Sequence, residues 1–384
     1  MRKPIWLVVA IMMLALPARA TPAFPAAAVL LEAARTGEPV TAALGSLGER
    51  AIRVWPNAVV APGARATLRD ATGSLHEVPL PAVDTLAGRV LGDDASVVRL
   101  TIADGIVAGT IATGVGAVSI HDGEVADARA DVSSIPVHDI ASSPEKDHGS
   151  LALSYFGTAN CRVPCGTLAA HVILDADDTF RALGPDTCFA RQIETLNDVD
   201  GIYALAETDI DLVVTQLNCW TSNELLGDAS TPAEEYLDNV RLAWDGQGQD
   251  RSTILHAVGF DMPGSTVGIA WLPGVCARAE PLNRVSPNRC AYGQAVYQAV
   301  PTGGYTASLF LRAKLAAHEI GHNFNAEHET AGCTGAGSIM CASLQTAGPN
   351  TFSPASASVI RQHAETTIGH IACVVGRDGV GTDC

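Results

Sequence analysis

The stretch that most constrains the fold of this chain is HEIGHNFNAEH, residues 318–328. His318 and His322 are four residues apart, so on a helix both imidazoles lie on the same face. His328 comes ten residues after His318 and cannot share one straight helix face with it. A chain that brings the three together must end its helix soon after His322 and then bend sharply. Asn325 stands at the expected bend, and asparagine is one of the few non-glycine residues that tolerate the left-handed backbone conformation.

The residue types in this stretch predict a zinc site. Two histidine nitrogens on one helix face suit zinc, and a third ligand, His328, leaves one tetrahedral position open for water. Glu319 follows the first histidine, so it projects near the metal without being obliged to ligate it. In the HExxH arrangement such a glutamate is the general base that acts on metal-bound water. We therefore expect one catalytic Zn²⁺ held by His318, His322 and His328, with Glu319 as the catalytic residue.

The first twenty residues, MRKPIWLVVAIMMLALPARA, predict a secretory signal peptide. They combine a positive start, an apolar run of twelve residues and small residues before a cleavage point after Ala20. The apolar run is too short to span ~30 Å of hydrocarbon comfortably. We expect the remaining protein to be secreted and not to contact a membrane. The net charge of −17 also disfavours binding to nucleic acid or to anionic lipid.

Cysteine usage agrees with export and marks a boundary. All ten cysteines follow residue 160, and an even number in an exported chain favours disulfide bonds. The sequence alone does not choose their pairing. Residues 21–150 lack cysteine and predict a small β-rich domain, because β-branched runs alternate with Asp-Gly and Thr-Gly turns. Its last part, residues 131–150, is polar and is expected to be an exposed linker.

Residues 151–384 have a different pattern, which predicts a mixed α/β or α+β domain. Strand-like runs begin near residues 168, 209, 252 and 265. Helical spacing occurs near residues 186–208 and 230–246, and another helix is expected from about Ser308 into the histidine stretch. Strands that alternate with helices favour a mixed sheet packed against helices.

The histidine stretch resembles the extended zinc signature of the metzincin metalloproteases, HExxHxxGxxH. GSIMCAS resembles the Met-turn of that clan, with Met340 at the position beneath the zinc. VGIAWLPGVC and NTFSPASASVIRQHA are most similar to the edge strand and the last helix of the reprolysin, or adamalysin-like, group. The likeness covers residues 168–373. Two residues depart from it: Asn325 replaces the usual glycine, and Glu329, where reprolysins usually have aspartate, resembles the astacin group, although the tyrosine of that group is missing.

The resemblance implies a twisted mixed sheet with an active-site helix, preceded by a propeptide domain over residues 21–150. It implies a zinc endopeptidase, made as a precursor, that acts on protein or peptide substrates. The substrate would lie along the edge strand at Gly268, Ile269 and Ala270, and residues 342–350 would shape the pocket for the residue after the cut. We expect a monomer. The alternatives are a secreted zinc-binding protein without catalysis and a metallohydrolase that acts on a non-peptide substrate.

Several other polar residues compete for a role. His256 is expected in the core, and His363 and His370 flank the last helix without binding metal, because the zinc site is already complete. The tail GRDGVGTDC resembles half of a calcium-binding loop, but Asp-Gly turns are the favoured interpretation. Because residues 21–160 lack cysteine, latency would need a carboxylate, a histidine or simple occlusion of the cleft. The candidate residues are His121, Asp122, His138 and Asp139.

Overall fold

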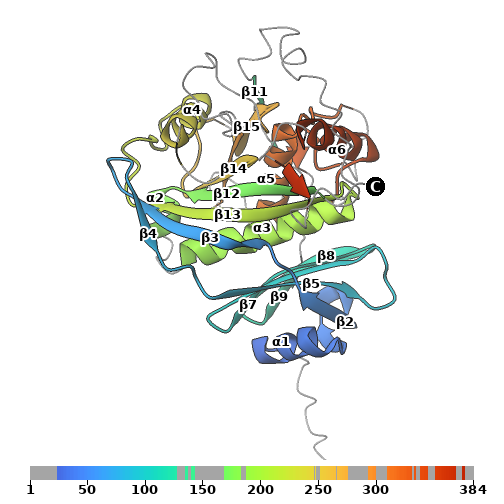
Figure 1. Ribbon diagram of the computed structural model, residues 1–384. Helices are drawn as coiled ribbons and strands as arrows, with labels where there is room; N and C mark the ends of the chain where they lie inside the picture. The colour runs from blue at the N-terminus through green and yellow to red at the C-terminus, as the bar shows by residue number, and fades with distance from the viewer. Residues whose placement is uncertain are drawn as a thin grey trace, which may run out of the picture.

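The computed structural model contains two large β-sheets with a long helix between them (Figure 1). Helix α3 (Thr187–Leu205) packs on one sheet through strand β13 (Ile210–Trp220) and on the other through strand β6 (Val97–Ala103). The structure describes residues 24–127, 135–136, 140–142, 168–182, 187–245, 247, 251–264, 266–275, 293–299, 309–330, 333, 338–344, 351–368 and 374–376.

The first sheet is antiparallel throughout and contains seven strands in the order β1-β2-β5-β6-β7-β8-β9. Helix α1 packs against β1 and β2, and its end is marked by Gly37 in the left-handed conformation. The core of this part is a separate apolar cluster that includes Leu30, Val98 and Ile111. The elements are α1 (Ala27–Thr36), β1 (Val40–Ala43), the 3-10 turn η1 (Gly45–Leu47), β2 (Glu49–Pro56), β5 (Val83–Val90), β6, β7 (Ile106–Thr113), β8 (Gly116–His121) and β9 (Glu124–Asp127).

The second sheet contains nine strands, eight of them in the order β11-β15-β16-β14-β12-β13-β3-β4. Most neighbours are parallel; β15 against β16, β3 against β4 and β12 against β18 are antiparallel. The ninth strand, β18, pairs with the start of β12. The strands are β3 (Val60–Arg69), β4 (Leu75–Val78), β11 (Ile140–Ser142), β12 (Leu168–Ala176), β13, β14 (Thr253–Val258), β15 (Gly268–Leu272), β16 (Gln294–Gln298) and β18 (Val374–Gly376).

Helices cover both faces of the nine-stranded sheet. Alternate residues of the buried strand β12 point to opposite faces: Val172 and Leu174 join the core with α3 and α5, whereas Ile173 joins the core with α4. Among the described residues, no helix is long and apolar enough to cross a membrane. The remaining elements are α2 (Asp178–Ala182), α4 (Ala233–Trp244), α5 (Leu309–Asn323), α6 (Pro354–Ile368) and a two-stranded pair of β10 (Ile135–Pro136) with β17 (Ser343–Leu344).

The sequence predicts most elements of the second half. Strands expected near residues 168, 209, 252 and 265 correspond to β12, β13, β14 and β15, and the mixed sheet with helices is confirmed. The N-terminal region is rich in strands, as expected, but its strands β3 and β4 belong to the nine-stranded sheet rather than to its own. Within the described residues 24–127, β3 and β4 therefore extend the sheet of the second half, whereas the other strands form a sheet of their own. The short β10 and β11 also lie within the expected linker, where the polar composition gave no strand signal.

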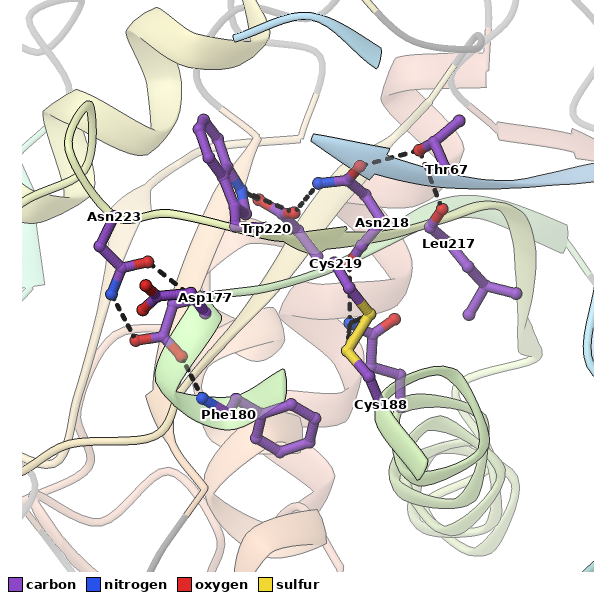
Figure 2. The surroundings of a disulfide bond; sticks show 12 residues. Thr67, Asp177, Phe180, Cys188, Leu217, Asn218, Cys219, Trp220 and Asn223 are labelled. Atoms are coloured by element: carbon purple, nitrogen blue, oxygen red, sulfur yellow. Dashed lines mark hydrogen bonds between the residues drawn. A yellow bond between two sulfur atoms is a disulfide. The ribbon is translucent and has the colours of Figure 1, made fainter. Parts of the chain in front are cut away.

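Two disulfides occur among the described residues. Cys188 in α3 is bonded to Cys219 in β13, which ties the helix to the sheet it covers (Figure 2). Cys333 is bonded to Cys341, which closes a short loop after the histidine stretch. The expectation of disulfides is confirmed for these four cysteines. The other six, and the signal peptide, lie outside the described residues.

Candidate metal centre

The three histidines of the central stretch converge. Helix α5 carries His318 and His322 on one face, both buried, and ends at Asn323. The next turn is closed by left-handed Asn325, with φ of 69°. The predicted bend is therefore confirmed, and it returns the half-buried His328 to the other two. The three Nε2 atoms lie 2.9 Å, 3.2 Å and 3.2 Å from one another.

The hydrogen bonds of Nδ1 in His318 and His322 determine which nitrogen of each ring carries the proton. Nδ1 of His318 lies 2.6 Å from the carbonyl oxygen of Ile339, and Nδ1 of His322 lies 2.6 Å from that of Ala326. A carbonyl only accepts, so each Nδ1 carries the proton and each Nε2 offers a lone pair. Two lone pairs 2.9 Å apart repel each other unless a cation lies between them. The arrangement is that of metal-binding histidines oriented by their outer nitrogen.

The spacing of the Nε2 atoms fits zinc. Ligand nitrogens at 2.0–2.1 Å from a tetrahedral zinc stand about 3.3 Å apart, close to the observed separations. Burial also lowers the pKa of His318 to about 3, so its ring is neutral and able to ligate at neutral pH. Within the described ranges, the group that could hold a metal contains these three histidines. Three protein ligands leave a fourth position for water or substrate.

Glu319 lies beside this group and is buried. Neither carboxylate oxygen has a hydrogen-bond partner among the described residues. Burial raises the pKa of Glu319 well above its usual value. The carboxylate lies against Gly268, the first residue of β15: a Cβ at Gly268 would stand 2.2 Å from Oε1 of Glu319. A side chain at this position would collide with the carboxylate where it now lies.

Met340 lies under the metal-binding helix α5. Its side chain is buried, and its sulfur would be 2.7 Å from a Cβ at Gly321. Gly321 therefore allows the helix and the methionine to approach closely. The neighbouring carbonyl of Ile339 accepts the bond from His318. The segment that contains Met340 thus contacts the metal-binding helix in two places.

Glu329 ties the third histidine to two distant segments, which the sequence did not predict. Its carboxylate accepts hydrogen bonds from the hydroxyl groups of Ser338, Ser353 and Ser356, and its backbone N–H donates to the carbonyl of Met340. Burial acts to raise the pKa of Glu329, but the serine hydroxyls outweigh it and the pKa is lowered. The clustered serines in SPASAS, at the start of the last helix, were the available signal.

Asn323 is a second residue that the sequence analysis missed. It follows His322 at the end of α5 and is fully buried. Its amide donates to the carbonyls of Trp271 and Gln294, each at 3.0 Å, and its oxygen accepts from the Thr253 hydroxyl at 2.6 Å. It therefore fixes the end of the metal-binding helix against β15, β16 and β14. The signal was a polar residue at a helix position that faces the sheet.

The other candidate residues lie elsewhere. His256 is in the core, as predicted, where its Nδ1 contacts Asp175 at 2.8 Å. His363 is half-buried on α6 with Nε2 3.4 Å from the carbonyl of Val275. His121 and Asp122 are exposed at the turn after β8 and are not in the metal-binding group. His138, Asp139, His370 and the tail proposed for calcium lie outside the described residues.

Comparison with known proteins agrees with the geometry in indicating a metallopeptidase. Residues 189–329 match the family described as "Metallo-peptidase family M12B Reprolysin-like". The chain is also 26% identical over 257 residues to "Disintegrin and metalloproteinase domain-containing protein B" of Aspergillus fumigatus. That match covers 61% of this chain and 31% of the relative, so the chain spans less than a third of the relative's length. The family match includes the three histidines and ends before Met340.

Proposed function

We propose that this chain, whose residues 189–329 match the reprolysin-like metallopeptidase family, is a secreted zinc-dependent endopeptidase made as a precursor. The observation that carries the proposal is the convergence of three histidine Nε2 atoms beside a buried carboxylate that has no hydrogen-bond partner in the described part of the chain. Each group in this arrangement has a role in the hydrolysis of a peptide bond.

The histidines would hold one zinc ion. His318 and His322 are fixed by their Nδ1 bonds, and His328 is fixed by the turn at Asn325 and by the bonds of the adjacent Glu329. Bound zinc lowers the pKa of a water molecule towards ~7 and polarises the substrate carbonyl. A rigid ligand set keeps the fourth position open for these two tasks.

Glu319 would act as the general base. It takes the proton from the attacking water and delivers it to the leaving amine, as a buried carboxyl with a raised pKa can do. A structural zinc site would need no such group, and it would more often be closed by a fourth protein ligand. The unpaired carboxylate thus favours the enzyme over the alternative of a zinc-binding protein without catalysis.

The substrate would add a strand to β15. This strand pairs with β16 on one side through Gly268, Ile269 and Ala270, and its other side is a sheet edge apart from the short β11. An extended peptide can pair with such an edge through backbone hydrogen bonds. Gly268 also contacts Glu319, which would bring the paired peptide next to the base. A peptide substrate is therefore favoured over a small non-peptide one.

The precursor would be silent because its own chain occupies this edge. β11 pairs with β15 at Ala270, Trp271 and Leu272, and β10 pairs with β17, just after Met340. Both pairings must be lost before a substrate can enter. Since residues 21–160 contain no cysteine, no propeptide thiol before the linker can block the zinc. A cut within residues 131–160 should activate the protein.

The experiment is hydrolysis of an internally quenched peptide library before and after a specific cut in the linker. We expect little turnover before the cut, strong turnover after it, complete loss with a chelator and recovery when zinc is restored. A cut protein that contains zinc but hydrolyses no peptide, while it hydrolyses another class of substrate, would support the non-peptide alternative. Hydrolysis that persists without metal would contradict the proposal.

A further inference from the structure

Two segments of the N-terminal region pair with the nine-stranded sheet, one at each edge. At the β15 edge, β11 contributes three residue pairs, Ile140 to Ser142. At the opposite edge, β3 runs parallel to β13 from Val60 to Arg69, and β4 pairs outside β3 (Figure 1). The two contacts differ in extent, so a cut in the linker should affect them differently.

Arg69 anchors the longer contact. Its side chain is fully buried between two tryptophans, with the guanidinium carbon 4.9 Å from the ring centre of Trp220 and 4.1 Å from that of Trp244. It also donates a hydrogen bond to the carbonyl of Ala243. The arginine comes from the N-terminal region, whereas both tryptophans come from the part of the chain after residue 168 that contains the three histidines, here called the metal-binding half. Without β3, two large aromatic faces would be exposed to water.

Arg69 also balances a buried charge. Asp175 is fully buried in β12 and lies between Trp220 and Trp244, whose indole nitrogens donate to it at 3.1 Å and 2.8 Å. Burial acts to raise its pKa, but His256 and Arg69 outweigh burial and lower the pKa to about 2. Asp175 is therefore ionised inside the core, where a charge without a fixed counter-charge is strongly destabilising.

Thr67 links the same strand to this network. Its hydroxyl group donates to the side-chain oxygen of Asn218 at 2.8 Å and lies 3.2 Å from the carbonyl of Leu217 (Figure 2). Asn218 in turn donates to Asp175 at 2.7 Å. A chain of buried hydrogen bonds thus runs from β3 to the carboxylate. Asn218 and the carbonyl of Leu217 would each lose a hydrogen bond inside the core if β3 were removed.

The contact of the first sheet with α3 is different. Arg99 pairs with Asp200 at 3.2 Å, and Thr110 donates to Asp198 at 2.8 Å. These are polar groups at an interface, and water could replace each partner if the surfaces separated. This contact therefore does not require the N-terminal region to stay. The contact made by β3 does require it, because the side chains that hydrogen-bond or pack with β3 lie within the core of the metal-binding half.

We propose that residues 60–78 remain an integral part of the catalytic sheet after the linker is cut, so that the active protein is a two-chain complex held through Arg69. The linker cut then frees the β15 edge, where β11 is short, and leaves the β3 edge paired. This inference rests on the proposed function in one respect only, namely that the linker is cut. The N-terminal segment would be a permanent second chain and not a released inhibitor.

The test begins with the full-length chain, into which a recognition sequence for a specific protease is inserted after Ser150, in the Glu319→Gln background to prevent self-digestion. After the cut, the two fragments should elute together in size-exclusion chromatography at about 1 μM protein, with the summed mass in native mass spectrometry. In hydrogen exchange, the amides of Val214 and Thr221, which donate to Val59 and Arg69, should stay protected. Elution of the N-terminal fragment alone would overturn the proposal.

Variants then test the anchor. Arg69→Ala should raise the dissociation constant of the two fragments by about 100-fold or more, because it removes one of the two basic groups that keep Asp175 ionised and the cation that packs on Trp220 and Trp244. Arg65→Ala is the matched control, since Arg65 lies on the same strand but is exposed, and it should have no effect. Thr67→Val is a milder change that should weaken association about fivefold or more and is useful if Arg69→Ala does not fold.

Equal association in Arg65→Ala, Arg69→Ala and Thr67→Val would overturn the role of this anchor. None of these measurements uses peptide hydrolysis. A complex that stays together but hydrolyses no peptide when Glu319 is restored would count against the proposed function alone. Separation of the fragments with full hydrolysis by the larger one would count against this proposal alone.

Discussion

The contact between Glu319 and Gly268 gives a sharp prediction about catalysis. In Gly268→Ala the new Cβ would stand 2.2 Å from Oε1 and 2.7 Å from Cδ of Glu319, whereas real Cβ atoms essentially never approach closer than 3.0 Å. The carboxylate or the strand must therefore move by about 0.8 Å, the difference between these two distances. Leu315 stands at 2.9 Å from the same position and limits movement in its direction.

The magnitude follows from which group moves. The end of a glutamate side chain is flexible, so the cost to stability should be modest, ~1–3 kcal/mol as for other small overpacking changes. A catalytic group misplaced by about 1 Å can lose ~100-fold in rate. We expect kcat for a peptide substrate to fall by about 100-fold. Zinc content should be unchanged, because the new methyl group approaches the base and not the three histidines.

The assay is steady-state hydrolysis by linker-cut protein, with zinc measured on the same sample. Gly114→Ala is the matched control, because a Cβ at Gly114 meets nothing within 4 Å and its φ is not in the left-handed range. The control should leave both rate and zinc content unchanged. If Gly268→Ala turned over peptide at the rate of the unchanged protein, Glu319 would not be the base in the position seen here.

Three further predictions concern the bend, the interface and latency. Asn325→Gly should keep zinc, whereas Asn325→Val should lower the affinity for zinc by about tenfold or more in chelator competition. A β-branched residue is poorly accommodated at φ of 69°. Equal zinc affinity in the two variants would contradict a role for the left-handed backbone at this position. Burial raises the pKa of Asp198 well above its usual value, against the bond from Thr110. The folded state therefore holds this proton at a pH where the unfolded chain has lost it, so unfolding free energy in urea should fall as pH rises towards the raised pKa, by up to ~1.4 kcal/mol per pH unit. Asp198→Asn should flatten that slope, and an unchanged slope would assign it to other groups. Thiol-reactive reagents should not activate the uncut precursor; activation would show that Cys161 or Cys165 blocks the zinc.

Much of the metal site could be predicted because its information is local. The spacing of His318 and His322 fixes one helix face, and the need for a third ligand fixes the bend at Asn325. The strands from β12 to β15 were also visible, since buried parallel strands are continuous apolar runs bounded by turn residues.

The remaining features depend on contacts between distant residues. No local pattern indicates that β3 pairs with β13, about 150 positions later. The alternation of apolar and polar residues along β3 suits a strand of either sheet equally well. From the sequence, Arg69 is expected at the surface, as most arginines are; in the folded chain Trp220 and Trp244 enclose it. The serine partners of Glu329 and the contact of Gly268 with Glu319 likewise exist only after the chain has folded.

The most direct test of the central claim compares the unchanged protein with Glu319→Gln, both cut in the linker. Zinc per chain is measured by mass spectrometry and peptide turnover is measured on the same samples. We predict one zinc ion per chain in both and loss of nearly all turnover in Glu319→Gln, since the ligands remain and the base is gone. Full turnover in Glu319→Gln, or a folded protein that binds no zinc, would contradict it.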